Sequence, residues 1–332
     1  MIITGKDLIK RVLIDPASEL GCDEFRVVSG YATAAMASHH IELLANIDKK
    51  IRMNVLVGMT SREGIVDVQH EGFKKLMEYY QDYFECSYFM QSLKPCHAKI
   101  YIWMKEGKPV KSFLGSANYT HNAFFNHQHE VLYECDSDIA LEFFNSFSSN
   151  TICCNHCEVG YAVTIVNRKQ YLARNARAEE AVGVLRDYTG LGHKTFSLLT
   201  RQGSPGGPGV RLNWGQRRGR EKNQAYLHIP SHIAKKGFFP SRKQQFTVLT
   251  DDGKSMICVI AQDNEKAIQT TNNNSELGLY FRKRLGLEPG TFITTEDLIR
   301  YGRTDVTFCK IDNETYYMDF RVDHGEIMIG RC

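Results

Sequence analysis

The stretch CHAKIYIWMKEGKPVKSFLGSANYT, residues 96–120, contains two apolar runs separated by the polar segment KEGK. Side chains of a β-strand alternate between its two faces, so His97 and Lys99 are expected to project together. After the KEGK turn the chain returns as a neighbouring strand, which ends in a glycine-flanked segment with Ser116 and Asn118. The stretch therefore predicts a hairpin that gathers polar side chains at one end.

These residue types are suited to binding and attacking a phosphate. A histidine can be a nucleophile or a proton donor near neutral pH, and a neighbouring lysine places positive charge against phosphate oxygens. Ser116 and Asn118 add hydrogen-bond donors, and free backbone amides in such a segment favour an anion. Glu130 begins the next predicted strand and could hold the imidazole of His97 in one tautomer.

The remainder of the first half alternates between strand and helix patterns. Short apolar runs predict strands at 25–33, 51–59, 86–92, 97–104, 110–116 and 129–136, and helical spacing predicts helices at 34–48, 71–84 and 138–147. Strands interleaved with helices predict an α/β domain, a mixed sheet with helices on its faces.

The pattern changes near residue 175. A charged helix is predicted to connect two domains, and short strands then dominate at 194–200, 224–230, 244–262 and 305–322. Asp252-Gly253 and Asp312-Asn313 indicate hairpin turns, while helices are expected only at 231–239, 276–286 and 294–302. We therefore predict a catalytic, dimerising domain at 1–175, a linker helix at 176–192 and a mainly β, barrel-like domain at 193–332.

Length and composition are those of an ordinary folded protein. The chain has 332 residues and a net charge of +3, and no apolar run approaches the ~18 residues that span a bilayer. Charges interrupt the first apolar stretches, so we expect no secretory signal and a cytoplasmic location. Cys153, Cys154, His156 and Cys157 resemble a metal site, but adjacent cysteines cannot easily share one ion, so we predict no metal and reduced thiols.

The motif His-x-Lys, followed by Gly-Ser-x-Asn and a glutamate, resembles the active site of the phospholipase D superfamily. The resemblance implies that His97 attacks the phosphate to form a covalent phosphohistidine, that Lys99, Ser116 and Asn118 hold the phosphate, and that Glu130 orients the histidine. Many members carry an aspartate where this chain has Met104. Nucleases of the superfamily can lack it, so the departure weakens a lipid-enzyme reading more than a nuclease reading.

A superfamily active site uses two such motifs, and this sequence has one. The resemblance therefore implies a homodimer in which one His97 attacks and the other protonates the leaving oxygen. It implies no cofactor and no metal for the chemistry.

Two polar, basic stretches stand out in the second half. They are predicted to contact DNA because arginine suits guanine edges, Asn and Gln suit adenine, and Lys, Ser and Thr suit phosphates. In the first stretch, residues 211–224, the candidates are Asn213, Trp214, Gln216, Arg217, Arg220 and Asn223. In the second, residues 264–284, they are Lys266, Gln269, Thr270, Asn272, Asn273, Asn274, Arg282 and Arg284. By composition alone both stretches would sooner be polar loops on a barrel rim.

The segments LNWGQR, NQAYLHIP, FTVLTDDG, KAIQTTNNNSELGLYFRKRLGL and YGRTD resemble the C-terminal domain of NgoFVII-type restriction endonucleases. That domain is a pseudobarrel related to plant B-three DNA-binding domains, and two arms of it grip the major groove. The first half, including SGYAT, resembles the phospholipase-D-like nuclease domain of the same family. We call residues 211–224 the first arm and residues 264–284 the second arm.

The resemblance implies a type II restriction endonuclease that cuts double-stranded DNA at a short sequence, with a companion DNA methyltransferase in the cell. One alternative is a phospholipase-D-type lipid phosphodiesterase or phosphatidyltransferase, against which stand the basic arms and the lack of an amphipathic membrane helix. Another is a DNA-binding protein that needs an ATPase-helicase-like partner subunit to cut.

Overall fold

The computed structural model describes residues 2–92, 94–125, 128–166, 192–234, 236–242, 244–262 and 265–322. The chain divides into two compact units, Met1–Gly190 with the short segments Gln244–Thr247 and Asp312–Glu314, and the remainder from Leu191 to Cys332. The predicted linker at 176–192 lies outside the described residues except for its last position, so its helix stays a prediction.

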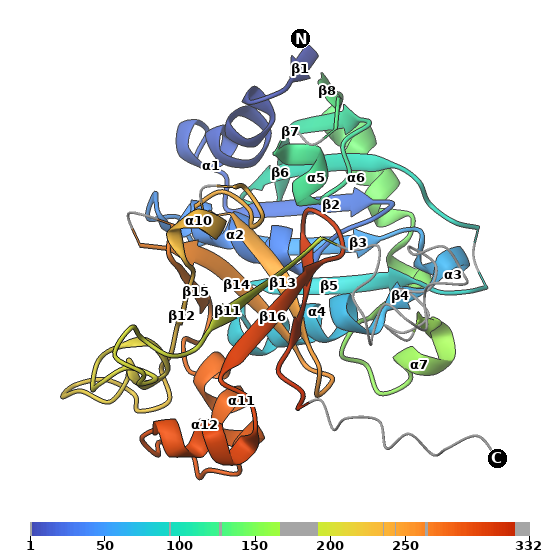
Figure 1. The fold of residues 1–332 in the computed structure, drawn as a ribbon. Coiled ribbons are helices and arrows are strands. Elements are labelled where there is room, and N and C mark those ends of the chain that lie inside the picture. The colour runs from blue at the N-terminus through green and yellow to red at the C-terminus, as the bar shows by residue number, and fades with distance from the viewer. Residues whose placement is uncertain are drawn as a thin grey trace. The chain divides into compact units, whose positions relative to one another are not determined.

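The first unit is built on a mixed eight-stranded sheet of order β1-β8-β7-β6-β2-β3-β5-β9 (Figure 1). Its strands are β1 (Ile2–Thr4), β2 (Glu24–Ser29), β3 (Arg52–Val57), β5 (Phe84–Phe89), β6 (Lys99–Lys105), β7 (Lys108–Gly115), β8 (Val131–Cys135) and β9 (Thr151–Cys153). The β2–β3 and β3–β5 pairs are parallel, and the other neighbours are antiparallel. The predicted α/β fold is confirmed, although β1 and β9, at the two edges, were not predicted.

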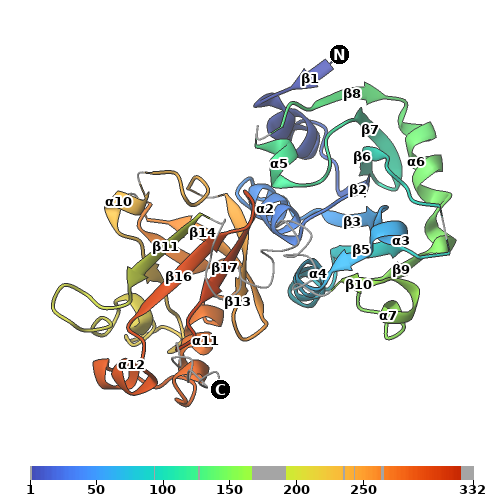
Figure 2. The same ribbon diagram turned by 45° about the vertical axis from the view of Figure 1, so that its right-hand side comes forward.

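Helices cover both faces of this sheet. Figure 2 shows α6 (Ser137–Asn145) on the side opposite α2 (Ala34–Ala45) and α4 (Asp67–Tyr79). The Thr33 side chain accepts a hydrogen bond from the Met36 amide and begins α2, and Asp136 does the same for Ile139 in α6. The α6 side of the core includes Val28, Ile102, Met104 and Phe144. Burial on both faces explains why the central strands are nearly continuous apolar runs.

Shorter elements complete the first unit. They are η1 (Ile9–Ile14), α1 (Asp15–Glu19), α3 (Thr60–Glu63), α5 (His121–Phe124), η2 (Ser148–Asn150) and α7 (Val159–Ala162), with a two-stranded parallel sheet of β4 (Ile65–Val66) and β10 (Ile165–Val166). The α5 helix follows the Gly-Ser-Ala-Asn segment closely, as predicted for a segment that leads into a helix.

The second unit is a curled seven-stranded sheet of order β11-β16-β17-β13-β14-β15-β12. Its strands are β11 (His193–Ser197), β12 (Leu227–His228), β13 (Gln245–Thr250), β14 (Ser255–Ala261), β15 (Ala267–Thr270), β16 (Asp305–Lys310) and β17 (Thr315–Asp319). Both predicted hairpin turns join neighbouring strands, and Gly253 takes the positive φ of 91° that the first of them needs. The mainly β prediction is confirmed.

Few helices accompany the second sheet: η3 (Arg211–Asn213), α10 (Ser231–Ala234), α11 (Glu276–Arg284) and α12 (Thr295–Tyr301). A capping box between Thr294 and Asp297 begins α12, and Gly302 ends it in the left-handed conformation. In the described parts of the chain, no helix combines the length and the apolar character needed to cross a membrane.

Candidate functional site

His97 and Lys99 lie where the chain enters β6. Lys99 is the first residue of the strand and pairs with Ser29 across the β2–β6 ladder. His97 comes two residues earlier, in a segment held against Gly58, whose carbonyl accepts a hydrogen bond from the Cys96 amide over 3.2 Å. A Cβ at Gly58 would lie 2.1 Å from the Cys96 carbonyl oxygen, so this approach requires a glycine.

The two side chains are in direct contact, as predicted. The Lys99 Nζ lies 3.0 Å from both ring nitrogens of His97 and donates to the His97 carbonyl over 2.8 Å. An atom equally close to both nitrogens must lie over the face of the imidazole, since in the ring plane it would collide with Cε1. The in-plane lone pair of a neutral imidazole therefore stays directed away from the ammonium.

Two further residues near His97, Gly30 and Tyr31, had no role in our sequence analysis. A Cβ at Gly30 would lie 2.9 Å from the His97 Cδ2 and 3.4 Å from the Asn118 Oδ1. The Tyr31 ring approaches the imidazole edge-on, with the ring centroids 6.0 Å apart, and its hydroxyl donates to Glu63 over 2.9 Å. The signal was in the sequence SGYAT, which we had used only as a family resemblance.

Asn118 is held in place through its carbonyl oxygen. Its Oδ1 accepts a hydrogen bond from the Tyr31 amide over 3.2 Å and lies 3.4 Å from the hydroxyl of the buried Ser29. That hydroxyl donates to the Tyr31 carbonyl over 2.6 Å and accepts from the Tyr119 amide over 2.9 Å. With Oδ1 so occupied, the Nδ2 group of Asn118 has no hydrogen-bond partner among the described residues and is available as a donor.

Ser116 and Glu130 form a second pair beside the first. The Ser116 hydroxyl donates to the Glu130 carboxylate, and it accepts from the Val131 amide over 3.0 Å. The Ser116 amide donates to the Val131 carbonyl over 2.9 Å. Among the described residues no hydrogen bond joins Glu130 to His97, so the expected orienting role of Glu130 stays a prediction.

Charge at this site is concentrated on a largely buried lysine. Lys99 is 7% exposed. Burial lowers the pKa of its ammonium, and the nearby Glu130 carboxylate opposes that effect by raising it. The structure thus brings all five predicted catalytic residues to one end of the sheet, with the Lys99 ammonium against the exposed imidazole of His97, Asn118 beside Gly30, and Ser116 paired with Glu130. Such a set can bind a phosphate group and attack it.

The first arm of the second unit is held by its own polar side chains. Asn213 is fully buried, with Nδ2 donating to the carbonyls of Gly206 and Ile293 over 2.9 and 2.8 Å and Oδ1 accepting from the Ile293 amide. Gln216 Nε2 donates to the carbonyls of Lys222 and Gly290 over 3.0 and 2.8 Å. These two side chains support the loop, so we revise their expected role of contacting DNA.

Asn223 and Arg282 belong to the same internal framework. Asn223 accepts from the Gly290 amide over 2.6 Å and donates to Glu221 over 2.8 Å. The fully buried guanidinium of Arg282 donates to four carbonyls, those of Leu212, Lys222, Gly278 and Thr291. Arg282 therefore joins both ends of the first arm to α11, and we revise its role, and that of Asn223, in the same way.

Trp214, Arg217 and Arg220 are placed differently. The two arginines are exposed, and their guanidinium carbons lie 5.7 and 5.2 Å from the centre of the half-buried Trp214 ring. Tyr226 supports the indole from another side, edge-on at 5.9 Å. The first arm thus presents two exposed arginine side chains beside one tryptophan ring, and the loop that carries them is held by internal hydrogen bonds.

Residues of the second arm divide in a similar way. Thr270 is buried and donates to the Asn273 carbonyl over 2.7 Å, and the Asn273 side chain accepts from the Ser275 amide, so both shape the turn after β15. The other predicted contacts on this arm are half-buried: Lys266, Gln269, Asn272 and Asn274.

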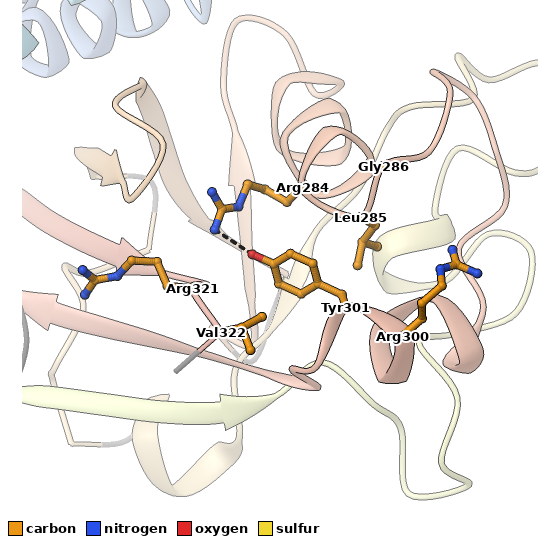
Figure 3. Close-up of a pocket in the computed structure, with 7 residues that line it drawn as sticks. All are labelled: Arg284, Leu285, Gly286, Arg300, Tyr301, Arg321 and Val322. Atoms are coloured by element: carbon orange, nitrogen blue, oxygen red, sulfur yellow. Dashed lines mark hydrogen bonds between the residues drawn. The ribbon is translucent and has the colours of Figure 1, made fainter. Parts of the chain in front are cut away.

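Arg284 ends α11 beside a pocket, shown in Figure 3, that is also lined by Leu285, Gly286, Arg300, Tyr301, Arg321 and Val322. Its Nη2 donates to the buried Asp251 carboxylate over 3.0 Å and to the Tyr301 hydroxyl over 2.6 Å. Because the positive charge of Arg284 is already paired with a carboxylate, this side chain is a weak candidate for a phosphate contact.

The cysteine-rich segment packs into the first unit. Cys154 is buried, and its Sγ lies 3.2 Å from the Met77 Sδ. Over the described ranges, no three His, Cys, Asp or Glu side chains converge in a way that would hold a metal ion.

Two family models match the chain. The model described as "NgoFVII restriction endonuclease N-terminal PLD domain" matches residues 6–161, and "NgoFVII C-terminal B3-like DNA-binding domain" matches residues 188–312. The two matched ranges correspond to the two folded units and span most of the chain. No curated protein sequence gives a match.

Solved structures similar to each half were also found. NucT from Helicobacter pylori is 15% identical and covers 46% of this chain and 97% of its own, with a TM-score of 0.32. Nuc from Salmonella typhimurium, a phospholipase D family member, is 14% identical with the same coverage and a TM-score of 0.33. A hypothetical protein from Arabidopsis thaliana is 15% identical and covers 39% of this chain and 89% of its own, with a TM-score of 0.21.

Proposed function

This chain belongs to the NgoFVII restriction endonuclease family, a family of nucleases with a DNA-binding domain, and from that membership we propose that it cuts double-stranded DNA through a phosphohistidine. The cut is made at a short recognition sequence, as in a type II restriction endonuclease. His97, Lys99, Ser116, Asn118 and Glu130 carry the chemistry.

The observation that carries this proposal is the arrangement around His97. One face of the imidazole is covered by the Lys99 ammonium, 3.0 Å from both ring nitrogens, and a Cβ placed at Gly30 would approach both the imidazole and the Asn118 side chain, so the amide lies near the ring. A phosphate bound at the imidazole can therefore accept hydrogen bonds from Lys99 and Asn118. Its negative charge is then neutralised where charge develops in the transition state.

The reaction proceeds in two displacements. In the first, a ring nitrogen of His97 forms a bond to phosphorus while the bond from phosphorus to the leaving sugar oxygen breaks, and that oxygen takes a proton from an acid. In the second, water forms a new P–O bond as the N–P bond breaks, and the proton that the water loses returns to the group that acted as the acid in the first step, so both His97 and the acid are regenerated. Lys99 and Asn118 bind the non-bridging oxygens throughout.

The acid in this proposal is His97 of a second copy, because the chain has one copy of the motif. A twofold axis would place the two imidazoles on opposite sides of one phosphate. No step requires a metal-bound water, so we expect the chemistry to need neither a metal nor a cofactor.

Sequence reading is assigned to the arms of the second unit. On the first arm we retain Arg217 and Arg220, supported by Trp214, since their charged ends are exposed. On the second arm we retain Lys266, Gln269 and Asn272. Arginine is the commonest partner of guanine edges, so the first arm favours a guanine-containing site.

A nuclease of this kind endangers the DNA of its own cell. We therefore expect a companion methyltransferase and a cytoplasmic location. The alternative is that cleavage requires an ATPase-helicase-like partner subunit, and the test below distinguishes the two cases.

The test is digestion of plasmid or phage DNA by the purified protein, with and without EDTA, followed by sequencing of the ends. We expect ends at one short sequence, with EDTA present or absent. Full inhibition by EDTA would contradict the phosphohistidine chemistry, and cutting only after addition of ATP and a partner would favour the subunit-dependent alternative.

A further inference from the structure

Tyr31 is a partly exposed aromatic residue beside the proposed nucleophile. The centroid of its ring lies 6.0 Å from that of His97, the two ring planes are at 82°, and the residue is 40% exposed. A ring with this exposure contributes only part of its surface to the core. The rest of its surface is available to a molecule bound at His97.

The main chain of Tyr31 is fixed on both sides. Its amide donates to the Asn118 Oδ1 over 3.2 Å, and its carbonyl accepts from the buried Ser29 hydroxyl over 2.6 Å. The carbonyl of the preceding Gly30 accepts from the Met59 amide over 3.0 Å, just beyond the paired ends of β2 and β3. The position of Tyr31 is thus set by the backbone bonds that form this end of the sheet.

The ring of Tyr31 is also held at its outer end. Its hydroxyl donates to the Glu63 carboxylate over 2.9 Å, and Glu63 is the last residue of α3. Burial and this hydrogen bond raise the pKa of the Tyr31 hydroxyl, so it remains a donor at neutral pH. The Thr60 hydroxyl, at the start of α3, lies 2.9 Å from the carbonyl oxygens of both Val57 and Phe89, which fixes the helix to the sheet. A tyrosine bonded at both ends presents a rigid surface and loses little conformational entropy on binding.

A DNA phosphate held at His97 carries a nucleoside on either side. A base inside a duplex is out of reach of such a site unless it is flipped, so the part of the nucleoside next to the phosphate that a side chain meets is its deoxyribose. The Tyr31 ring, 6.0 Å from the imidazole, is close enough to touch that sugar. Contacts to sugar and phosphate fix the register of a protein on DNA without reading its sequence.

We propose that Tyr31, held by Glu63, is the surface against which the deoxyribose next to the scissile phosphate packs. The inference rests on the proposed phosphohistidine function and adds to it a substrate contact outside the catalytic motif. Tyr31 touches the substrate, and Glu63 is a positioning residue that acts through the Tyr31 ring. The contact determines which phosphate of the backbone is presented to His97, while the arms read the sequence.

The test removes the ring from the protein and the sugar from the DNA, separately and together. The protein variants are Tyr31→Ala and Tyr31→Phe in the full chain. Next to the cut, the duplex carries a normal nucleotide, a tetrahydrofuran abasic residue that keeps the sugar ring, or a propanediol spacer that lacks sugar and base. Each replacement is made on the 5′ side and on the 3′ side of the cut. Single-turnover cleavage rates at saturating protein then measure the coupling between the ring and the sugar.

Tyr31→Ala should cut the normal duplex ~10- to 100-fold more slowly than the wild type, because the scissile phosphate is no longer held in register. Tyr31→Phe keeps the ring and should lose only a few-fold. On one side of the cut, the wild type should be slowed by the propanediol spacer but not by the tetrahydrofuran residue. Tyr31→Ala should lose little further rate on that propanediol duplex, whereas a merely structural role of Tyr31 would make the two losses multiply.

The matched control is Tyr161→Ala, since Tyr161 is 90% exposed on α7 of the same unit. It should cut every duplex at the wild-type rate. Glu63→Ala releases the ring and should slow cleavage less than Tyr31→Ala does, while Glu63→Gln keeps an acceptor for the hydroxyl and should restore the rate. The Kd for the normal duplex should be the same in all variants, because binding is assigned to the arms.

Losses that multiply on both sides of the cut would overturn the sugar contact, while cleavage by the wild type would leave the proposed function standing. A Tyr31→Ala protein that cuts the normal duplex at the wild-type rate would overturn the inference as well. A wild type that cuts no DNA would contradict the proposed function, and with it the inference.

Discussion

The catalytic end of the first sheet and the first arm of the second unit both collect polar side chains, but they use them in opposite ways. Around His97 the surrounding structure leaves polar groups available, as for Asn118, whose Oδ1 is bonded while its Nδ2 has no hydrogen-bond partner among the described residues. Asn213 of the first arm and Arg282 of α11, which holds that arm, direct their hydrogen bonds inward. A cluster of polar residues therefore indicates a binding site only when the fold leaves some of their hydrogen-bond donors or acceptors available to a ligand.

The largest difference between the two regions should appear in the DNA cleavage rate when the proposed catalytic residues are substituted. Lys99→Ala and Asn118→Ala should each reduce the cleavage rate by ~100-fold or more, since each removes a donor that stabilises the transition state. His97→Ala should abolish cleavage. Specific DNA binding should change little in all three, because reading is assigned to the other unit. Single-turnover cleavage and a binding assay on the same duplex measure the two quantities. A His97→Ala protein that still cleaves DNA would contradict the assignment of the cleavage chemistry to this end of the sheet.

The next largest effect should come from Arg282, and it should be structural. Arg282→Met leaves the carbonyls of Leu212, Lys222, Gly278 and Thr291 without their buried donor, which we expect to cost about 2–4 kcal/mol of local stability. Hydrogen exchange across residues 211–224 measures the loss of protection. Arg217→Met, on the same arm but exposed, is the matched control and should leave exchange unchanged. Equal hydrogen exchange in the two variants would show that Arg282 stabilises the first arm no more than an exposed arginine does.

A smaller effect is expected for the exposed arginines themselves. Arg217→Ala and Arg220→Ala should each weaken binding to the recognition sequence by about 1–3 kcal/mol if the side chain reads a base, with relaxed preference at one position. A phosphate contact should instead weaken all sequences alike and flatten the salt dependence. Selection from a randomised duplex library at two salt concentrations separates the two roles. If the variant that lacks both arginines selects the same sequence from the library, other residues must read the bases.

The smallest effect, taken per pH unit, is expected when the catalytic unit is acidified. His40 is fully buried, bonded to the Tyr119 hydroxyl and the Leu13 carbonyl over 2.8 Å each, and burial lowers its pKa to about 4. An unfolded histidine titrates near pH 6.5, so between about pH 6.5 and 4 the unfolded chain takes up a proton that the folded unit does not. Stability should therefore fall by about 1.4 kcal/mol per pH unit as the pH drops through that range.

The measurement is the unfolding transition of the catalytic unit followed by Trp103 fluorescence in a Trp214→Phe background, which leaves one tryptophan in the chain. His40→Gln, which does not titrate, should remove the His40 share of this pH dependence even if it lowers stability at pH 7; the slope that remains is expected from His39, whose pKa burial lowers to about 3. An equally steep dependence in that variant would assign the titration to other groups.

The order of strands, helices and turns could be predicted because periodicity and turn residues are local properties of a sequence. The placement of the candidate site residues at one end of the sheet could be predicted for a related reason: His97 and Lys99 are two positions apart, and Ser116 and Asn118 end the neighbouring strand, so local geometry almost suffices to bring them together. The chemistry of His-x-Lys with Gly-Ser-x-Asn then narrows the reaction to few classes.

Tertiary structure alone decided which polar groups remain available. Arg282 and Arg217 look alike in a sequence, yet one lies among four backbone carbonyls contributed by segments up to 70 residues away and the other is in solvent. Tyr31 and Gly30 reach His97 only because β2 pairs with β6. Burial and long-range strand pairing depend on residues distant in the chain, so they cannot be predicted from a local sequence pattern.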